Sequence, residues 1–353
     1  MDDTTWHGPG KHERPRGRRA WWLVALLVIA VLAGATVLTT RLLTDRPSPT
    51  ALPAPVDAPT ADGTPSGPPP TAAGSATQAP SASAVPRSSA SASASAKASP
   101  PAPRPPGRAT PKKGVSVWDF PGIGQALADV RASWYYNWSS GPSRNAGSSA
   151  KFVPMIWGPK SVTDSELARA KANGSVLLGF NEPDFASQSN MTVEKALELW
   201  PRLQATGMRL GSPAVAVGGD RAGGWLDRFI SGARSKGLRV DFITLHWYGS
   251  DFSDAAAGQL KGYLQAVYNR YRLPIWVTEY ALIRWGGGGA AFPSDAQQAS
   301  FATKSTAMME SLSYVERYAW FALPTPTEGG QGTGLYRNGT TPTAAGRAYR
   351  AAG

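Results

Sequence analysis

The sequence has no cysteine and only three histidines, and both shortages limit the chemistry open to the chain. Without cysteine there is no disulfide, no thiolate metal site and no cysteine nucleophile. His246 is the only histidine beyond the N-terminal tail, so a zinc site built from histidines cannot be assembled there. A Ser-His-Asp triad would depend on His246 alone, and no G-x-S-x-G motif accompanies it. We therefore expect neither a metal nor a cofactor.

Acidic residues are fewer than basic ones, which gives the chain a formal net charge of +12. The basic residues are spread along the sequence rather than gathered into a stripe of the kind that nucleic-acid binding needs. A mildly basic, solvated surface accounts for the charge. We predict no nucleic-acid partner.

One long apolar run lies near the start of the sequence. Residues 1–19 form a basic tail, and residues 20–40 carry no charge. As a helix this run spans roughly 31 Å, close to a hydrocarbon core of about 30 Å. The basic tail should stay in the cytoplasm, so we predict a signal-anchor over 20–40 that leaves the rest on the extracellular face of the membrane. A cleaved signal peptide and a secreted protein stay open, because Ala33-Gly-Ala35 offers a cleavage site.

Residues 41–112 are dominated by proline, alanine, serine and threonine, and contain no aromatic residue. A segment of this composition cannot bury enough apolar surface to offset the entropy lost on ordering. We predict a disordered linker that holds a folded domain away from the membrane.

Residues 113–353 have the size and pattern of one folded domain. Short apolar runs, typical of strands buried on both faces, alternate with helical patterns. The eight strand candidates are residues 114–118, 133–137, 152–157, 175–181, 209–214, 241–247, 275–279 and 318–321. The helix candidates are 163–173, 192–205, 225–236, 255–271 and 294–312, whereas 138–150 shows no helical pattern. About 240 residues with eight such strands predict an α/β fold, a (β/α)8 TIM barrel.

Two glutamates end strands of this pattern. Glu182 follows the fourth strand candidate and Glu279 ends the seventh, 97 positions later. The C-terminal ends of barrel strands form the catalytic face, so the two carboxylates should meet there. Two carboxylates are the minimal chemistry of glycoside hydrolysis.

Three motifs in this order resemble glycoside hydrolase family 128, the β-1,3-glucanases of clan A. They are Gly179-Phe-Asn-Glu-Pro-Asp184, Leu245-His-Trp-Tyr248 and Trp276-Val-Thr-Glu-Tyr280. The resemblance implies a retaining, endo-acting hydrolase of β-1,3-glucan, with Glu182 as acid/base and Glu279 as nucleophile. It also places Asn181 against the sugar 2-hydroxyl, and His246 and Tyr248 as hydrogen-bond donors to Glu279.

Several tryptophans at or just beyond strand ends are candidates for stacking on sugar rings. We predict that Trp157 and Trp320 are such substrate-binding platforms. Trp134 and Trp247 stay open between a platform and a place in the core. With a β-glucan as substrate and the membrane as the only other partner, we expect a monomer.

Three other functions remain open from the sequence. The first is a clan A hydrolase acting on another polysaccharide, such as a mannan or an arabinogalactan. The second is a non-catalytic glycan-binding module, from which one carboxylate would be missing. The third is a cell-wall anchor in which the linker is the working part.

Overall fold

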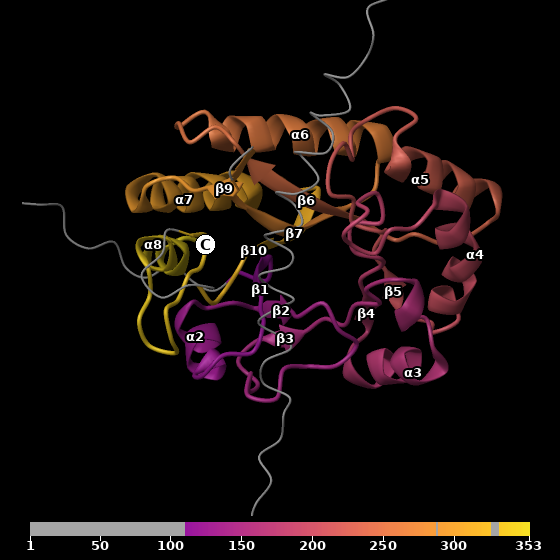
Figure 1. Ribbon diagram of the computed structural model, residues 1–353, viewed down its shortest axis with the longest axis horizontal. Helices are drawn as coiled ribbons and strands as arrows, with labels where there is room; N and C mark the ends of the chain where they lie inside the picture. The colour runs from indigo at the N-terminus through magenta and orange to yellow at the C-terminus, as the bar shows by residue number, and fades with distance from the viewer. Residues whose placement is uncertain (1–109, 287–288, 326–331) are drawn as a thin grey trace, which may run out of the picture. The chain divides into compact units, whose positions relative to one another are not determined.

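Figure 1 shows the fold in the computed structural model, which describes residues 110–286, 289–325 and 332–353. The predicted basic tail, the predicted membrane anchor and the predicted linker up to residue 109 lie outside these residues. Within the described ranges, no helix combines the length and the apolar character needed to cross a membrane.

The centre of the domain consists of parallel strands, as predicted. Six form one sheet in the order β3-β2-β1-β10-β7-β6, and β4 pairs with β5 in parallel. These eight strands are β1 (Lys113–Ser116), β2 (Trp134–Tyr136), β3 (Lys151–Phe152), β4 (Val176–Leu177), β5 (Arg209–Leu210), β6 (Ile243–Gly249), β7 (Ile275–Leu282) and β10 (Val315–Trp320). Each of the eight strand candidates overlaps one of them, which confirms a parallel α/β sheet.

Single parallel bridges connect the two sheets at both ends. Met155, just after β3, pairs with Leu178 beside β4, and Gly211 after β5 pairs with Phe242 before β6. A further parallel bridge joins Asn181 to Ala214, beyond the ends of β4 and β5. The parallel arrangement therefore continues from β3 through β4 and β5 to β6.

Helices follow most of the strands and lie around them in Figure 1. They are α2 (Ile123–Asp129), α3 (Asp164–Asn173), α4 (Val193–Gln204), α5 (Trp225–Ser235), α6 (Ala256–Tyr271), α7 (Asp295–Ser311) and α8 (Ala344–Ala351). Ser294 and Gln297 form a capping box at the start of α7, and the Thr163 hydroxyl caps α3. The five helix candidates are confirmed, and residues 138–150 contain no helix.

The sequence patterns did not predict α2, α8 or the hairpin of β8 (Arg284–Gly286) and β9 (Gly289–Ala291). Helix α2 has only seven residues and begins after Gly122, which has φ 85° and offers no side-chain cap. In the sequence, the four glycines at 286–289 interrupt any alternating pattern around the hairpin. Helix α2 and the hairpin therefore lack the local signal that marks the longer helices and strands.

Two clusters of buried side chains hold the strands. The larger packs the strands against the helices, whereas the smaller draws its residues from the strands and the residues beside them. In the smaller cluster Trp276 stacks on Phe242 with ring centroids 4.4 Å apart, and Trp134 lies 5.3 Å from Trp276. Tyr136 continues this cluster along β2 from Trp134. The cluster thus supports the C-terminal ends of the strands from below.

The ordered contacts of the domain begin before the predicted boundary at Lys113. The Lys112 ammonium donates to the carbonyl oxygens of Met309, Glu310 and Leu312 at 3.3, 3.0 and 3.0 Å, at the C-terminal end of α7. A cation at this end of a helix also interacts favourably with its dipole.

We expect a chain starting at residue 110 to be more stable than one starting at 113 by about 1–3 kcal/mol, because the shorter chain loses this cap. Thermal and denaturant unfolding of the two truncations measure the difference. Lys112→Met in the longer truncation keeps the Lys112 carbonyl, which accepts from the Trp134 indole and the Tyr318 N–H, so it should reproduce only the part of the loss that the cap contributes. Equal unfolding midpoints would contradict the capping role.

Candidate active site

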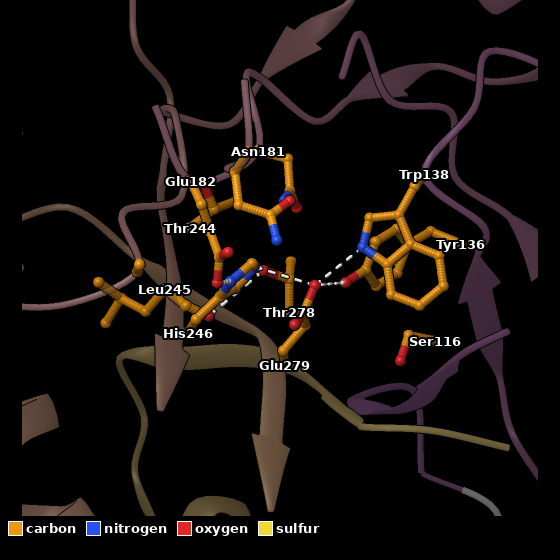
Figure 2. Close-up of polar contacts among 12 residues, drawn as sticks. Ser116, Tyr136, Trp138, Asn181, Glu182, Thr244, Leu245, His246, Thr278 and Glu279 are labelled. Atoms are coloured by element: carbon orange, nitrogen blue, oxygen red, sulfur yellow. Dashed lines mark hydrogen bonds and ion pairs between the residues drawn. The ribbon is translucent and has the colours of Figure 1, made fainter. Parts of the chain in front are cut away.

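Glu182 and Glu279 face each other at the C-terminal ends of the strands (Figure 2). Glu182 lies just beyond β4 and Glu279 lies in β7; both are buried, with 8% and 4% of their surface exposed. One oxygen of each carboxylate and a ring nitrogen of His246 all lie within 4.8 Å of one another. The two carboxylates that the sequence placed at strand ends are therefore brought together.

Three side chains donate hydrogen bonds to Glu279. The Tyr136 hydroxyl and the Trp138 indole N–H donate to Oε1 at 2.9 and 2.8 Å, and the Tyr248 hydroxyl donates to Oε2. Both oxygens of Glu279 thus accept hydrogen bonds, and donors of this kind stabilise a carboxylate. The predicted bond from Tyr248 is confirmed.

The two tyrosines remain donors over any ordinary pH. Burial, reinforced by the nearby Glu279 carboxylate, raises the pKa of Tyr136 and of Tyr248 well above the usual value of a phenol. Their hydroxyl protons are therefore retained, and each phenol can only donate to the carboxylate beside it.

Glu182 has a different environment. Burial raises the pKa of Glu182 above its usual value, although the bond from His246 opposes the shift. The residue also has φ 42°, in the left-handed region that residues with a Cβ seldom occupy. Its main-chain N–H donates to the Ala214 carbonyl at 2.7 Å, which fixes the strained turn against the neighbouring strand.

His246 lies between the two carboxylates and is fully buried. Its Nδ1 is 2.9 Å from Glu182 Oε1, and its Nε2 is 3.3 Å from Glu279 Oε1. Burial disfavours the charged imidazolium, but the Glu279 carboxylate and the bond to Glu182 outweigh it and raise the pKa of His246. The expected donation from His246 to Glu279 is corrected here, because the hydrogen bond goes to Glu182.

Asn181 and Asp184 complete the turn around Glu182. Asn181 is buried beside Glu182, and its side-chain Nδ2 donates to Gln188 Oε1 at 3.4 Å. Asp184 instead accepts main-chain N–H bonds from Ala216 and Val217, at 2.8 and 3.4 Å. It fixes the loop after β5.

The structure places both Trp320 and Trp134 in the core, so the prediction of a sugar platform at Trp320 is wrong and the open question at Trp134 is answered in favour of the core. Trp320 is fully buried: it packs on Tyr280 and Tyr349, and its N–H donates to the Thr333 carbonyl. Trp134 is buried in the smaller core cluster. Neither ring offers a face to a ligand.

Trp247, which the sequence left open, lies away from the site, whereas Trp157 stays a prediction. Trp247 is half-buried and stacks on Phe301 of α7, on the opposite face of β6 from His246 and Tyr248. Trp157 is also half-buried, and its carbonyl accepts the Asn181 N–H at 2.9 Å. It therefore lies beside the strand end that carries Glu182.

Four aromatic residues near Glu279 were missed as site residues: Tyr136, Trp138, Trp118 and Phe321. Trp118 stacks on Trp138 with centroids 5.9 Å apart, and Phe321 packs edge-on against both rings and against Tyr248. Trp118, Trp138 and Phe321 are half-buried and form what we call the aromatic wall. Strand alternation could have found Phe321, because it follows the outward-facing Trp320.

Within the described ranges, Glu182, His246 and Glu279 form the group whose donor atoms lie close enough to hold a metal ion. Their atoms are already engaged: His246 Nδ1 bonds to Glu182, and both oxygens of Glu279 accept hydrogen bonds. A cation would have to displace these partners, so the absence of a metal requirement stays our prediction.

Comparison with known proteins bears directly on this arrangement. The family model described as a glycosyl hydrolase catalytic core matches residues 123–349. A solved endo-β-1,3-glucanase of glycoside hydrolase family 128, from Amycolatopsis mediterranei, is 62% identical, with a TM-score of 0.67. The match covers 69% of this chain and all of that one. The chain belongs to glycoside hydrolase family 128.

More distant relatives show the same core. A family 128 endo-β-1,3-glucanase from Sorangium cellulosum is 28% identical with a TM-score of 0.58, over 69% of this chain and 98% of its own. Alkali-sensitive linkage protein 1 of Schizosaccharomyces pombe is 33% identical over 210 residues, 57% of this chain. The chain spans about a third of that protein, 36% of its length.

The spacing of the glutamates is shared with the Amycolatopsis enzyme. Structures of the Amycolatopsis enzyme carry substitutions of two glutamates that are 97 positions apart, the separation of Glu182 and Glu279 here. One of these variants holds laminarihexaose.

We expect the adjacent residues Trp320 and Phe321 to respond oppositely to alanine. Trp320→Ala opens a core cavity and should cost about 3–5 kcal/mol of stability. Phe321→Ala should raise KM for laminarihexaose about 5- to 30-fold, the loss of roughly 1–2 kcal/mol of ring contact, with a smaller change in kcat. Steady-state kinetics and thermal unfolding separate the two. An unchanged KM for Phe321→Ala would mean that the aromatic wall is not part of the binding site.

Proposed function

We propose that this protein is a retaining, endo-acting glycoside hydrolase of β-1,3-glucan. The observation that carries the proposal is the closeness of two buried carboxylates, with oxygens of Glu182 and Glu279 within 4.8 Å. Retaining enzymes separate their carboxyl groups by about 5–5.5 Å, whereas inverting enzymes need about 6.5–9.5 Å to admit a water. Direct attack by one carboxylate fits two carboxylates this close together.

In the first step Glu279 is the nucleophile and Glu182 the acid. Glu279 attacks the anomeric carbon while the bond to the leaving sugar breaks, and the leaving oxygen takes the proton of Glu182. The raised pKa of Glu182 supports this role, because an acid must hold its proton until the leaving oxygen arrives.

In the second step Glu182 is the base. Once ionised, it takes a proton from a water molecule, whose oxygen attacks the anomeric carbon and releases Glu279 as a carboxylate. The three hydrogen-bond donors around Glu279 stabilise that carboxylate as it leaves. His246, which contacts both glutamates, keeps the acid/base oriented between the two steps.

The substrate assignment rests on relatives and on the aromatic wall. The Amycolatopsis enzyme, 62% identical, is an endo-β-1,3-glucanase solved with laminaritriose. The half-buried rings of Trp118, Trp138 and Phe321 beside Glu279 offer apolar faces of the kind that pyranose rings pack against. Asn181, next to Glu182 in the sequence, is the residue that we expect to contact the sugar 2-hydroxyl. Laminarin should therefore be cleaved far faster than mannan or arabinogalactan.

We also propose that the eight parallel strands close into a (β/α)8 barrel. The bridges Met155–Leu178 and Gly211–Phe242, which continue the sheet from β3 to β6, support closure. In a closed barrel both glutamates occupy the C-terminal face, where the loops shape the substrate site.

The location of the enzyme is proposed from sequence alone. The apolar run of residues 20–40 and the proline- and alanine-rich segment behind it support a domain tethered on the extracellular face of the membrane. Protease treatment of intact cells should release the active domain. Activity that stays protected inside the cells would contradict the tether.

The roles of the two glutamates can be separated with an activated aryl β-glucoside and azide. Glu279→Gln should abolish turnover of every substrate. Glu182→Gln should be slowest on glucans, whose leaving alkoxide needs a proton, and should still form the glycosyl-enzyme from the aryl substrate. Azide needs no general base, so it should accelerate turnover by Glu182→Gln.

Azide acceleration of Glu279→Gln instead would mean that the roles are reversed. Near-wild-type activity of either variant on laminarin would contradict the two-carboxylate mechanism. A control variant must not disturb the core. Gln298 of α7 is buried and bonds to Leu282, so Gln298→Glu would place a charge in the core and is not suitable. Exposed Glu194→Gln, at the first turn of α4, is the matched control and should keep full activity.

A further inference from the structure

The two oxygens of Glu279 have different surroundings. Oε1 accepts from the Tyr136 hydroxyl at 2.9 Å and from the Trp138 indole at 2.8 Å, and His246 Nε2 lies 3.3 Å away. Oε2 accepts from the Tyr248 hydroxyl. Figure 2 shows the indole and the phenol converging on one side of the carboxylate.

We propose that Oε1 is an anchored oxygen, that Oε2 is the oxygen that attacks the anomeric carbon, and that Trp138 and Tyr136 are positioning residues acting through Oε1. The proposal rests on the nucleophilic role of Glu279 in the proposed function. The proposal adds which oxygen of Glu279 reacts and which residues position it.

Attack uses a lone pair of the reacting oxygen, so a hydrogen bond to that lone pair must weaken first. Attack through Oε1 would disturb two well-formed bonds, whereas attack through Oε2 disturbs one. As the Oε2–C1 bond forms, the C1–O bond to the leaving sugar breaks, and its electron pair stays on the leaving oxygen, which takes the Glu182 proton. Oε1 becomes the ester carbonyl and keeps both donors throughout.

The same donors assist the second step. When water attacks C1, the electron pair of the C1–Oε2 bond returns to the carboxylate and its charge spreads onto Oε1. Two donors already aimed at Oε1 stabilise that charge without rearranging, which is how preorganised hydrogen bonds lower a barrier. Tyr136 retains its proton for this purpose, because burial and the adjacent carboxylate raise its pKa.

The backbone around Trp138 is built to hold the indole in place. Trp138 has φ 56°, a conformation that residues with a Cβ rarely adopt. The Asn137 side chain fixes this turn by donating to the Gly141 carbonyl at 3.0 Å and accepting the Ser139 N–H at 3.3 Å. The Trp138 ring is then packed between Tyr136 and Trp118, with centroids at 5.1 and 5.9 Å. A strained residue held from several sides is typical of functional sites.

The test uses Trp138→Phe and Tyr136→Phe in the full chain, each of which keeps a ring and removes one donor to Oε1. A 2-deoxy-2-fluoro laminaribiosyl fluoride reports attack directly, because fluoride leaves without an acid. We expect its inactivation rate constant to fall about 10- to 100-fold in each variant, the effect of losing a hydrogen bond to a charged group. kcat on laminarihexaose should fall similarly, with KM changed less than about threefold.

Trp225→Phe is the matched control, since it removes an indole N–H bond to the Met191 carbonyl, 2.8 Å long, outside the site. It should inactivate at the wild-type rate. Thermal unfolding shows whether each variant is folded; if Trp138→Phe is not, Tyr136→Phe decides the question at the same oxygen.

Inactivation that is unchanged or faster in a folded variant would overturn the proposal, because removing donors from an attacking oxygen should free it. The Glu279→Gln variant distinguishes a failure of the oxygen assignment from a failure of the proposed function. If it is inactive while the Phe variants react normally, only the assignment of the oxygens fails. If Glu279→Gln still turns over glucan, the proposed function itself fails.

Discussion

The structure of this site depends on keeping two carboxylates close together in a buried place. Two like charges that are within 4.8 Å of each other and shielded from water repel strongly. Ionising both glutamates at once is therefore unfavourable. The surroundings divide the roles. Glu279 receives three donors and suits the ionised form, whereas burial raises the pKa of Glu182 and favours its protonated form.

His246 makes this division possible without leaving a buried charge unpaired. Its Nδ1 meets Glu182 and its Nε2 faces Glu279, so a single proton can be shared along the line from acid to imidazole. Four strand ends supply the partners: β2 gives Tyr136, β4 leads to Glu182, β6 carries His246 and Tyr248, and β7 carries Glu279. The pairing of β6 with β7 shifts register between Leu245 and His246, which sets His246 opposite Glu279.

Much of this could be predicted from the sequence, because the relevant signals are local. The apolar runs gave the strands, the capping residues gave the helix starts, and the carboxylates at the ends of two strands indicated the chemistry. The bond from Tyr248 to Glu279 followed from the neighbouring positions of β6 and β7.

The aromatic residues could not be assigned in the same way. Whether a ring faces the substrate or the helices changes with one residue along a strand, and this separates the buried Trp320 from Phe321. Trp134 lies on the inner side of β2 but too deep in the core to meet a ligand. Trp138 reaches Glu279 only because of its left-handed backbone, and sequence gives no signal for that conformation at a tryptophan. The partner of His246 likewise depends on a register shift.

The most direct test of the account is the configuration of the first product released from laminarin, followed by proton NMR before mutarotation. Attack by Glu279 followed by attack of water inverts the anomeric carbon twice, so the new reducing end should appear first as the β-anomer. An initial α-anomer would mean that water attacks directly, and the close pair of carboxylates would then need another explanation.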